Sequence, residues 1–168
     1  MLTLRPMALR DEIAVRAANL DMAEGFTFAF DLDDSTPFGD YIQKLEDRRL
    51  GRGETNGAVP ETFLLAETHG AIVGRLSLRH ALNAQLRERG GHIGFGVLPG
   101  HRRRGYATEI LKQALILARG LGLKSVLLTC SEHNAGSRSV IEEQGGIYEG
   151  STTQPGGAAS RRYWIALS

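Results

Sequence analysis

The segment 102–107, Arg-Arg-Arg-Gly-Tyr-Ala, has the composition of an anion-binding turn. Residues 92–98 before it alternate like a strand, and apolar residues recur at helical spacing after Gly105, so the segment lies where a helix begins. Free backbone N–H groups and the helix dipole favour an anion there, and Gly105 has no side chain to block it. The pattern predicts a phosphate site, and the alternative is a solvated basic turn.

His92 begins the same predicted strand and is a second residue with chemistry to offer. An imidazole with an ordinary pKa of about 6.5 can accept a proton at neutral pH. Strand alternation places His92 on one face with Gly94 and Gly96, and glycines inside a strand often mark the close approach of a ligand or another backbone. His92 is therefore suited to accept a proton, and the alternative is a solvent-facing polar residue at a strand start.

Cys130 is the one cysteine of the chain, so it cannot form an intramolecular disulfide. No run of Cys or His has the spacing of a zinc site, and we expect no metal ligand and a reducing, cytoplasmic environment. Cys130 lies in the apolar run 125–130, where a cysteine is usually an inert core residue. An acyl-accepting nucleophile is the less favoured interpretation.

The elements that position these residues follow from apolar periodicity and from turn residues. Strands are expected at residues 2–4, 62–67, 72–79, 92–98, 125–130, 147–151 and 161–167. Helices are expected over 9–19, after Pro37, from Gly105 to 120–122, and from Asn134 or Ser137 to 145–146. Loops are expected at 51–58 and, mobile, between the last two strands.

The order of these elements predicts an α/β (α+β) fold in one domain over residues 1–168. Strand 92–98, the helix after it and strand 125–130 form a central βαβ crossover within a mixed, mostly antiparallel sheet flanked by helices. A chain of 168 residues with 42% hydrophobic content can bury a core without disulfides or a metal.

The charge balance argues against a nucleic-acid-binding protein. Lys and Arg number 20 against 19 Asp and Glu, and the net charge of +1 gives no broad field for a polyanion. A small nucleic-acid module using Arg102–Arg104 and Arg161–Arg162 is the alternative. The chain has no signal peptide and no run of 18 apolar residues, so we expect a soluble protein without a membrane partner.

Two motifs in register resemble a known family. Arg102-x-x-Gly105-x-Ala107 follows the strand end Val97-Leu98-Pro99, and residues 134–146 read Asn-Ala-Gly-Ser-Arg-Ser-Val-Ile-Glu-Glu-Gln-Gly-Gly. Together they are similar to the cofactor motifs of the GNAT superfamily, the Gcn5-related N-acetyltransferases, and resemble a branch of predicted bacterial acetyltransferases. The resemblance covers roughly residues 60–150.

The resemblance implies direct transfer of an acetyl group from acetyl-CoA to a primary amine within a ternary complex. It implies that the amides of 103–107 bind the pyrophosphate, and that the strand carrying Val97 diverges from the strand carrying Leu128 so that the thioester enters between them. The cofactor-binding residues implied in this way are Phe95, Gly96, Val97, Arg102, Arg103, Arg104, Gly105, Tyr106, Ala107, Thr108, Asn134 and Ser137.

The resemblance also indicates where catalysis would depart from the family. Many relatives carry a glutamate base near the start of the cofactor strand, where this chain has His92. The tyrosine that relatives often use as the acid is replaced here by Ile141. Tyr148 is our substitute, with His133, Cys130 and water as alternatives.

The acceptor and the assembly are less constrained by the sequence. Acidic residues near the N-terminal helices could hold a cationic amine, or could be solvated surface charges. They are Asp31, Asp33, Asp34 and Glu61. Monomer and homodimer both stay open, and the alternative to an enzyme is a noncatalytic acyl-CoA-binding or regulatory module.

Overall fold

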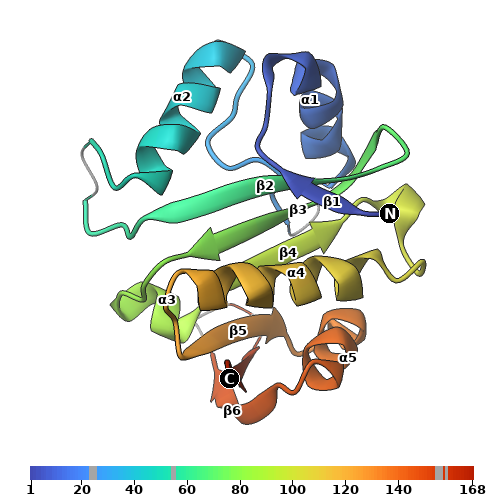
Figure 1. Ribbon diagram of the computed structural model, residues 1–168. Coiled ribbons are helices and arrows are strands. Elements are labelled where there is room, and N and C mark those ends of the chain that lie inside the picture. The colour runs from blue at the N-terminus through green and yellow to red at the C-terminus, as the bar shows by residue number, and fades with distance from the viewer. Residues whose placement is uncertain (23–25, 54–55, 154–156, 158) are drawn as a thin grey trace.

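A computed structural model describes residues 1–22, 26–53, 56–153, 157 and 159–168 of the chain. Seven strands form one sheet in the order β1-β2-β3-β4-β5-β7-β6, and all neighbours are antiparallel except the parallel pair β4 and β5. Helices pack on both faces (Figure 1). The predicted mixed, mostly antiparallel sheet with a central crossover is confirmed.

The strands are β1 (Thr3–Arg5), β2 (Glu61–Thr68), β3 (Ala71–Arg79), β4 (Ile93–Val97), β5 (Ser125–Ser131), β6 (Ile147–Thr152) and β7 (Ser160–Ala166). The helices are α1 (Glu12–Asp21), α2 (Phe38–Arg49), α3 (Ala84–Glu88), α4 (Tyr106–Gly120) and α5 (Ala135–Glu143). Short 3-10 turns lie at Leu9–Asp11 and Pro99–His101.

Two details differ from the sequence-based expectations. Helix α3 was not expected, because five residues are too few to show a helical period; its start is capped by Asn83, which accepts the N–H of Leu86. The cofactor strand is Ile93–Val97 and not 92–98, because His92 lies in a bend just before it. Residues 54–55 of the expected first loop, and 154–156 and 158 of the expected mobile loop, lie outside the described residues.

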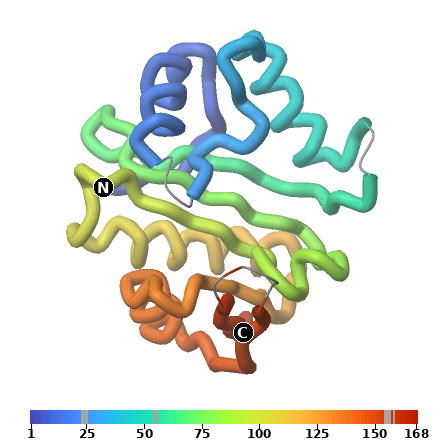
Figure 2. The backbone as a smooth tube through the Cα atoms, turned by 180° about the vertical axis from the view of Figure 1, so that it is seen from behind, coloured from blue at the N-terminus to red at the C-terminus, as the bar shows by residue number. Residues whose placement is uncertain are grey.

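Two separate cores hold the layers together. The larger core lies between the sheet and helices α4 and α5, and includes Leu76, Ile110 and Leu128. The smaller core lies between the other face of the sheet and helices α1 and α2, and includes Phe28 and Tyr41. Figure 2 shows the two helical layers on opposite sides of the sheet. Each face of the sheet can therefore carry a different binding function.

Strands β4 and β5 diverge soon after they meet. Within the described chain their ladder has one parallel pair, Ile93 with Leu128, whereas β4 pairs with β3 along its whole length from Ile93 to Val97. The β5 side of residues 94–97 is therefore left without a strand partner. Backbone groups on such an edge are available to an extended ligand.

Candidate functional site

The turn that precedes α4 has the backbone geometry of an anion-binding concavity. Gly105 caps the helix with φ of 81°, and Arg103 also has a positive φ of 62°. Left-handed residues in such a turn direct successive N–H groups toward one point. A Cβ built on Gly105 would meet no atom within 4 Å among the described residues, so the space beside Gly105 is open. The turn can therefore accept a phosphate.

The three arginines of this turn are not equivalent. Arg102 folds back, and its Nε donates a hydrogen bond to the carbonyl oxygen of Val97 at 3.1 Å. Arg103 and Arg104 are exposed, and in the part of the chain that the structure covers their side chains form no hydrogen bond or ion pair. Arg102 thus ties the turn to the end of β4, while the other two guanidinium groups are free to meet an anion.

The first turn of α4 and the strand before it complete the predicted cofactor surface. Tyr106, Ala107 and Thr108 are half-buried at the start of α4, and Phe95 packs on the larger core. A Cβ built on Gly96 would lie 2.6 Å from the ring of Phe26, and the predicted contact of the Gly96 backbone with the cofactor stays a prediction. On this face the missing side chain makes room for an aromatic ring of the same protein.

Asn134 and Ser137 lie at the start of α5. The side chain of Asn134 accepts the N–H of Ser137 at 3.0 Å and so caps the helix, as its position after β5 predicts. Asn134 is exposed and Ser137 is half-buried. The Oδ1 atom is used by the cap, which leaves the Asn134 amide group as a donor for a ligand.

We expect Asn134→Ala to weaken acetyl-CoA binding about tenfold, because one amide hydrogen bond to the ligand is lost. Losing the cap should also lower the free energy of unfolding by about 1 kcal/mol. Asn134→Ser is the matched control, since a hydroxyl keeps the cap but lacks the amide. Calorimetry and thermal unfolding on both variants separate the effects; a serine variant with wild-type affinity would make Asn134 a helix cap only.

His92 is held by the β4–β5 junction. Its side chain is 5% exposed, its ring lies edge-on to Trp164, and its Nδ1 accepts the backbone N–H of Leu127 at 2.9 Å. Burial lowers the pKa of His92, and the charges of Arg87 and Arg79 lower it further. His92 is thus not the solvent-facing residue of the alternative interpretation. A neutral ring that accepts at Nδ1 carries its proton on Nε2, so accepting a proton would require the Leu127 bond to break.

The predicted acid, Tyr148, lies on the edge strand β6. It is 47% exposed, its hydroxyl shares a hydrogen bond with Ser151 at 2.9 Å, and Arg161 stacks over its ring. Strands β5 and β7 separate Tyr148 from β4 in the sheet order. The structure therefore does not bring Tyr148 beside His92, and its catalytic role stays a prediction.

The residue at the family's tyrosine position and the two alternative candidates, Cys130 and His133, lie in different surroundings. Ile141 is 1% exposed and belongs to the larger core. Cys130 is buried, and burial raises the pKa of its thiol, which disfavours the reactive thiolate. His133 is exposed in the turn between β5 and α5.

The acidic residues proposed for a cationic acceptor are mostly engaged elsewhere. Asp31 forms an ion pair with Arg48 at 2.6 Å, and Asp33 accepts hydrogen bonds from Ser35 and Thr36. Asp34 is exposed. Glu61 begins β2, accepts a hydrogen bond from Ser77 and lies 3.9 Å from Arg79, both on β3.

Sequence reasoning missed the buried arginine of β3. Arg75 is 1% exposed and donates hydrogen bonds to the carbonyl oxygens of Gly94 and Thr27. The signal was present as polar residues alternating at 75, 77 and 79, but such a pattern normally indicates a solvated face. Here the segment before α2 covers that face.

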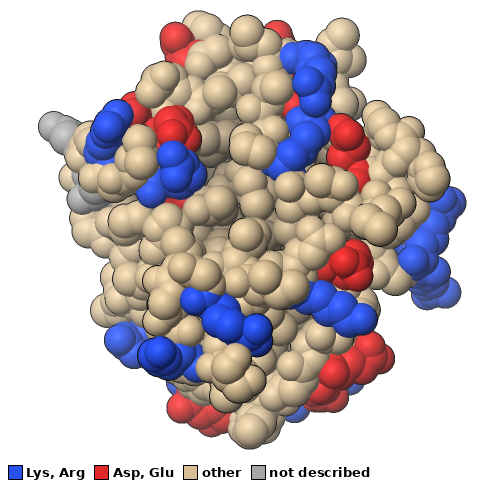
Figure 3. Space-filling model, in the orientation of Figure 1, with Lys and Arg blue, Asp and Glu red and all other residues tan. Residues whose placement is uncertain are grey.

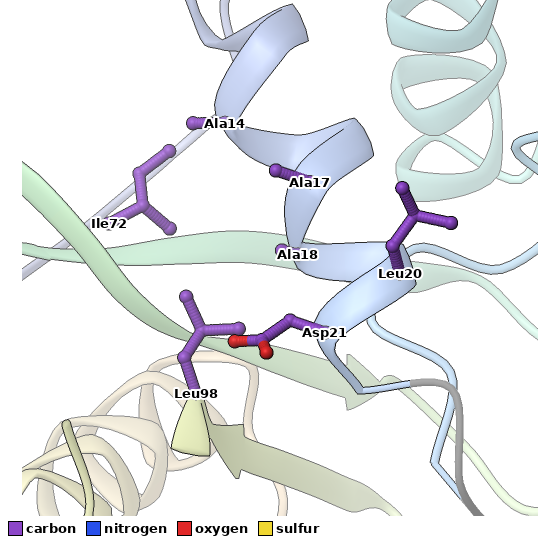
Figure 4. A pocket seen from close by; sticks show the side chains of 7 residues that line it. All are labelled: Ala14, Ala17, Ala18, Leu20, Asp21, Ile72 and Leu98. Atoms are coloured by element: carbon purple, nitrogen blue, oxygen red, sulfur yellow. The ribbon is translucent and has the colours of Figure 1, made fainter. Parts of the chain in front are cut away.

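A hollow of about 610 Å³ opens between α1 and the ends of β3 and β4. Its walls are mainly apolar, and Figure 4 shows Ile72 and Leu98 facing α1, with the carboxylate of Asp21 at its rim. Leu98 leads directly from β4 into the anion-binding turn. The hollow therefore adjoins the predicted cofactor surface from the side of the N-terminal helices.

The molecular face seen in the orientation of Figure 1 has no single-sign field. Figure 3 shows basic and acidic side chains interspersed over the visible face. No helix in the described ranges is long and apolar enough to cross a membrane. Within the same ranges, no three His, Cys, Asp or Glu residues lie together as a metal site would require. Positive charge is concentrated locally, in the turn formed by Arg102–Arg104 before α4.

Strands β4 and β5 thus diverge beside the glycine-capped turn that precedes α4. The chain belongs to the acetyltransferase (GNAT) family, whose model matches residues 25–146. The predicted family is confirmed by this match. A search of curated proteins found no match.

Three solved structures illustrate the likeness. The GNAT acetyltransferase from Streptococcus pneumoniae has a TM-score of 0.69 at 17% identity, covering 100% of both chains. YncA from Salmonella typhimurium, solved with acetyl-CoA, has a TM-score of 0.66 at 16% identity, covering 99% of this chain and 94% of its own. Spermidine N-acetyltransferase from Vibrio cholerae, solved with CoA and spermine, has 0.67 at 20% identity, covering 99% and 95%. These identities establish a shared fold.

Proposed function

We propose that the protein is an N-acetyltransferase that moves the acetyl group of acetyl-CoA to a primary amine of a small molecule or peptide. The observation that carries the proposal is the open anion-binding turn before α4, directly beside the unpaired edge of β4. Family membership supports it, as do the acetyl-CoA in YncA and the CoA in the spermidine enzyme.

In this proposal the cosubstrate follows the turn and then the strand. The amides of 103–107 bind the pyrophosphate, and the side chains of Arg103 and Arg104 add charge to that site. The backbone of 95–97 pairs with the pantetheine like an added strand. Asn134 and Ser137 approach it from α5. This path places the thioester where β4 and β5 diverge.

The transfer is direct. The acceptor nitrogen must lose a proton before it attacks, the tetrahedral intermediate carries an oxyanion, and the departing thiolate gains a proton. His92 is our candidate for the base, a role that requires its hydrogen bond with the N–H of Leu127 to break, and Tyr148 is our candidate for the acid. The buried thiol of Cys130, with its raised pKa, supports a ternary complex over an acetylated cysteine.

Turnover with a panel of amines tests the proposal. CoA thiol release should depend on both acetyl-CoA and one amine, and mass spectrometry should find the acetylated amine. A noncatalytic module would bind acetyl-CoA without acetylating any amine. A nucleic-acid module would bind oligonucleotides with an affinity that falls as salt rises, and acetyl-CoA would not displace them.

The proposal also includes a cytoplasmic location and a monomeric or dimeric state. Cell fractionation tests the location, and analytical ultracentrifugation tests the oligomeric state.

A further inference from the structure

The guanidinium groups of Arg75 and Arg79 lie close together over Gly94, the first residue of β4 that has no partner on the β5 side within the described chain. Arg75 and Arg79 project from β3 onto the sheet face that α1 and α2 cover. A Cβ built on Gly94 would lie 3.4 Å from Nη1 of Arg75 and 3.5 Å from Nη1 of Arg79. The absent side chain of Gly94 thus leaves space that both cations border.

In the described part of the chain, the two positive charges of Arg75 and Arg79 are not balanced by two carboxylates nearby. Arg75 has no carboxylate within 4.0 Å among the described residues, and its Nε is buried without a hydrogen-bond partner. Arg79 is 3.9 Å from Glu61, whose other oxygen accepts a hydrogen bond from Ser77 at 2.6 Å. Two largely buried cations therefore share one carboxylate. Burial of an unpaired charge is costly, so a missing anion would stabilise the site.

Aromatic rings and the sheet enclose Arg75, which is 1% exposed. The ring centroids of Phe26, Phe30 and Phe63 lie 4.2, 5.1 and 5.8 Å from the guanidinium carbon of Arg75. Desolvation, with a smaller effect of Arg79, lowers the pKa of Arg75 to about 9, so the group stays protonated at neutral pH. Phe26 also covers Gly96. An anion that reaches Arg75 must therefore displace the Phe26 ring from β4.

We infer that Arg75 and Arg79 bind a carboxylate on the acceptor, and that the acceptor is an amino acid or another amine that carries a carboxylate. The inference rests on the proposed acetyltransferase function and names its substrate class. A carboxylate over Gly94 lies beside the point where β4 and β5 diverge. Its amine would then be held next to the thioester entry.

The group transfer leaves the carboxylate unchanged. The deprotonated acceptor nitrogen forms a bond to the acetyl carbon, and the carbon–sulfur bond breaks. CoA leaves as a thiolate, and the proton released by the acceptor balances the one that the thiolate takes up. The two arginines therefore act in binding and orientation.

A polycationic acceptor fits the same surface poorly. It would approach two guanidinium groups, and like charges at close range repel. Asp31 and Asp33, which could have attracted a polyamine, are occupied by Arg48 and by the hydroxyls of Ser35 and Thr36. A carboxylate-bearing amine meets charges of the opposite sign.

Matched acceptors provide the test. Each of a series of L-amino acids is compared with the amine that lacks its carboxylate, for example L-lysine with cadaverine. With wild type, we expect kcat/KM for the best amino acid to exceed that of its decarboxylated partner at least about 30-fold, because charge-assisted hydrogen bonds are lost. Arg75→Met should reduce this preference about 10- to 100-fold through KM, with an unchanged Kd for acetyl-CoA.

Controls separate this inference from the proposed function. Arg119→Met removes an exposed arginine at the end of α4 and should leave both substrates unaffected. If Arg75→Met does not fold, Arg75→Lys keeps the charge and loses the two-pronged geometry, so KM should still rise. Efficient turnover confined to amines without a carboxylate, or an equal loss for both partners, overturns the inference alone. Absence of turnover with every amine overturns the proposed function, and this inference with it.

Discussion

Replacing Gly105 with aspartate should raise the Kd for acetyl-CoA at least about 100-fold. The residue caps α4 with φ of 81°, and the space in front of it is open. A carboxylate there would lie about 4 Å from a bound phosphate, and two like charges at that distance repel by about 4 kcal/mol at an effective dielectric constant of 20. Isothermal calorimetry measures the change directly.

Gly105→Asn is the matched control for this variant. Asn and Asp have nearly the same shape, and both tolerate a left-handed backbone better than other side chains do, so the two variants share the same backbone strain. Asn should weaken binding less than about tenfold. Equal affinities for the two variants would show that charge at this position does not matter, and the phosphate would have to bind elsewhere.

Replacing His92 should affect folding and catalysis in separable ways. Nδ1 of His92 accepts the N–H of Leu127, and both groups are buried. In His92→Asn, Oδ1 occupies nearly the same position as Nδ1, whereas in His92→Gln the oxygen is one bond further out. We therefore expect Asn to retain stability, and Gln to lower the free energy of unfolding by about 1–3 kcal/mol because Leu127 loses its acceptor. Urea denaturation at pH 7.5 decides this.

The same pair predicts how stability responds to acid. Burial lowers the pKa of His92 in the folded state, so the unfolded chain binds the proton more tightly. The stability of wild type should be complete above a pH of about 6.5 and should fall as the pH drops through the lower folded pKa. His80 has a lowered pKa as well and remains in both proteins, so the difference between wild type and His92→Asn reports His92. Parallel pH profiles would contradict this assignment.

His92→Asn also tests the proposed base. Loss of a positioned base should lower kcat/KM for the amine by roughly 10²- to 10⁴-fold, with little change in the affinity for acetyl-CoA. The acidic limb of the wild-type pH profile should disappear as well. If kcat/KM of the variant for the amine stays within about threefold of wild type, His92 is not the base and has only its structural role at the junction of β4 and β5. Glu61 would then be the next candidate for the base.

The larger part of the fold could be predicted because its signals are local. The change from strand alternation to helical spacing at Gly105 depends on neighbouring residues only, and the structure places the start of α4 there. Asn134 was identifiable as a cap for the same reason. Where local chemistry decides the conformation, one sequence is enough.

The acceptor side could not be predicted, because it depends on contacts between distant segments. Nothing in the alternation of strand 72–79 shows that Arg75 is buried, because Thr27, which accepts its hydrogen bond, lies 48 residues earlier in the chain. His92 was expected to share a face with Gly94, but Gly91 takes a positive φ of 61° and the bend turns the imidazole toward β5. Alternation describes a regular strand, and it fails to predict positions where tertiary packing overrides it.

The single ladder pair between β4 and β5 makes the sheet two half-sheets joined by a seam, β1–β4 on one side and β5, β7 and β6 on the other. An extended ligand lying in that seam would supply the missing strand and bridge the halves. Without that ligand the two halves should open transiently along the seam, and the amides of Phe95 and Val97, which face away from β3, should exchange their hydrogens more slowly once the seam is filled. The filled seam would also hold in place the surface beside Gly94 that the acceptor meets, so we expect acetyl-CoA to bind before the acceptor.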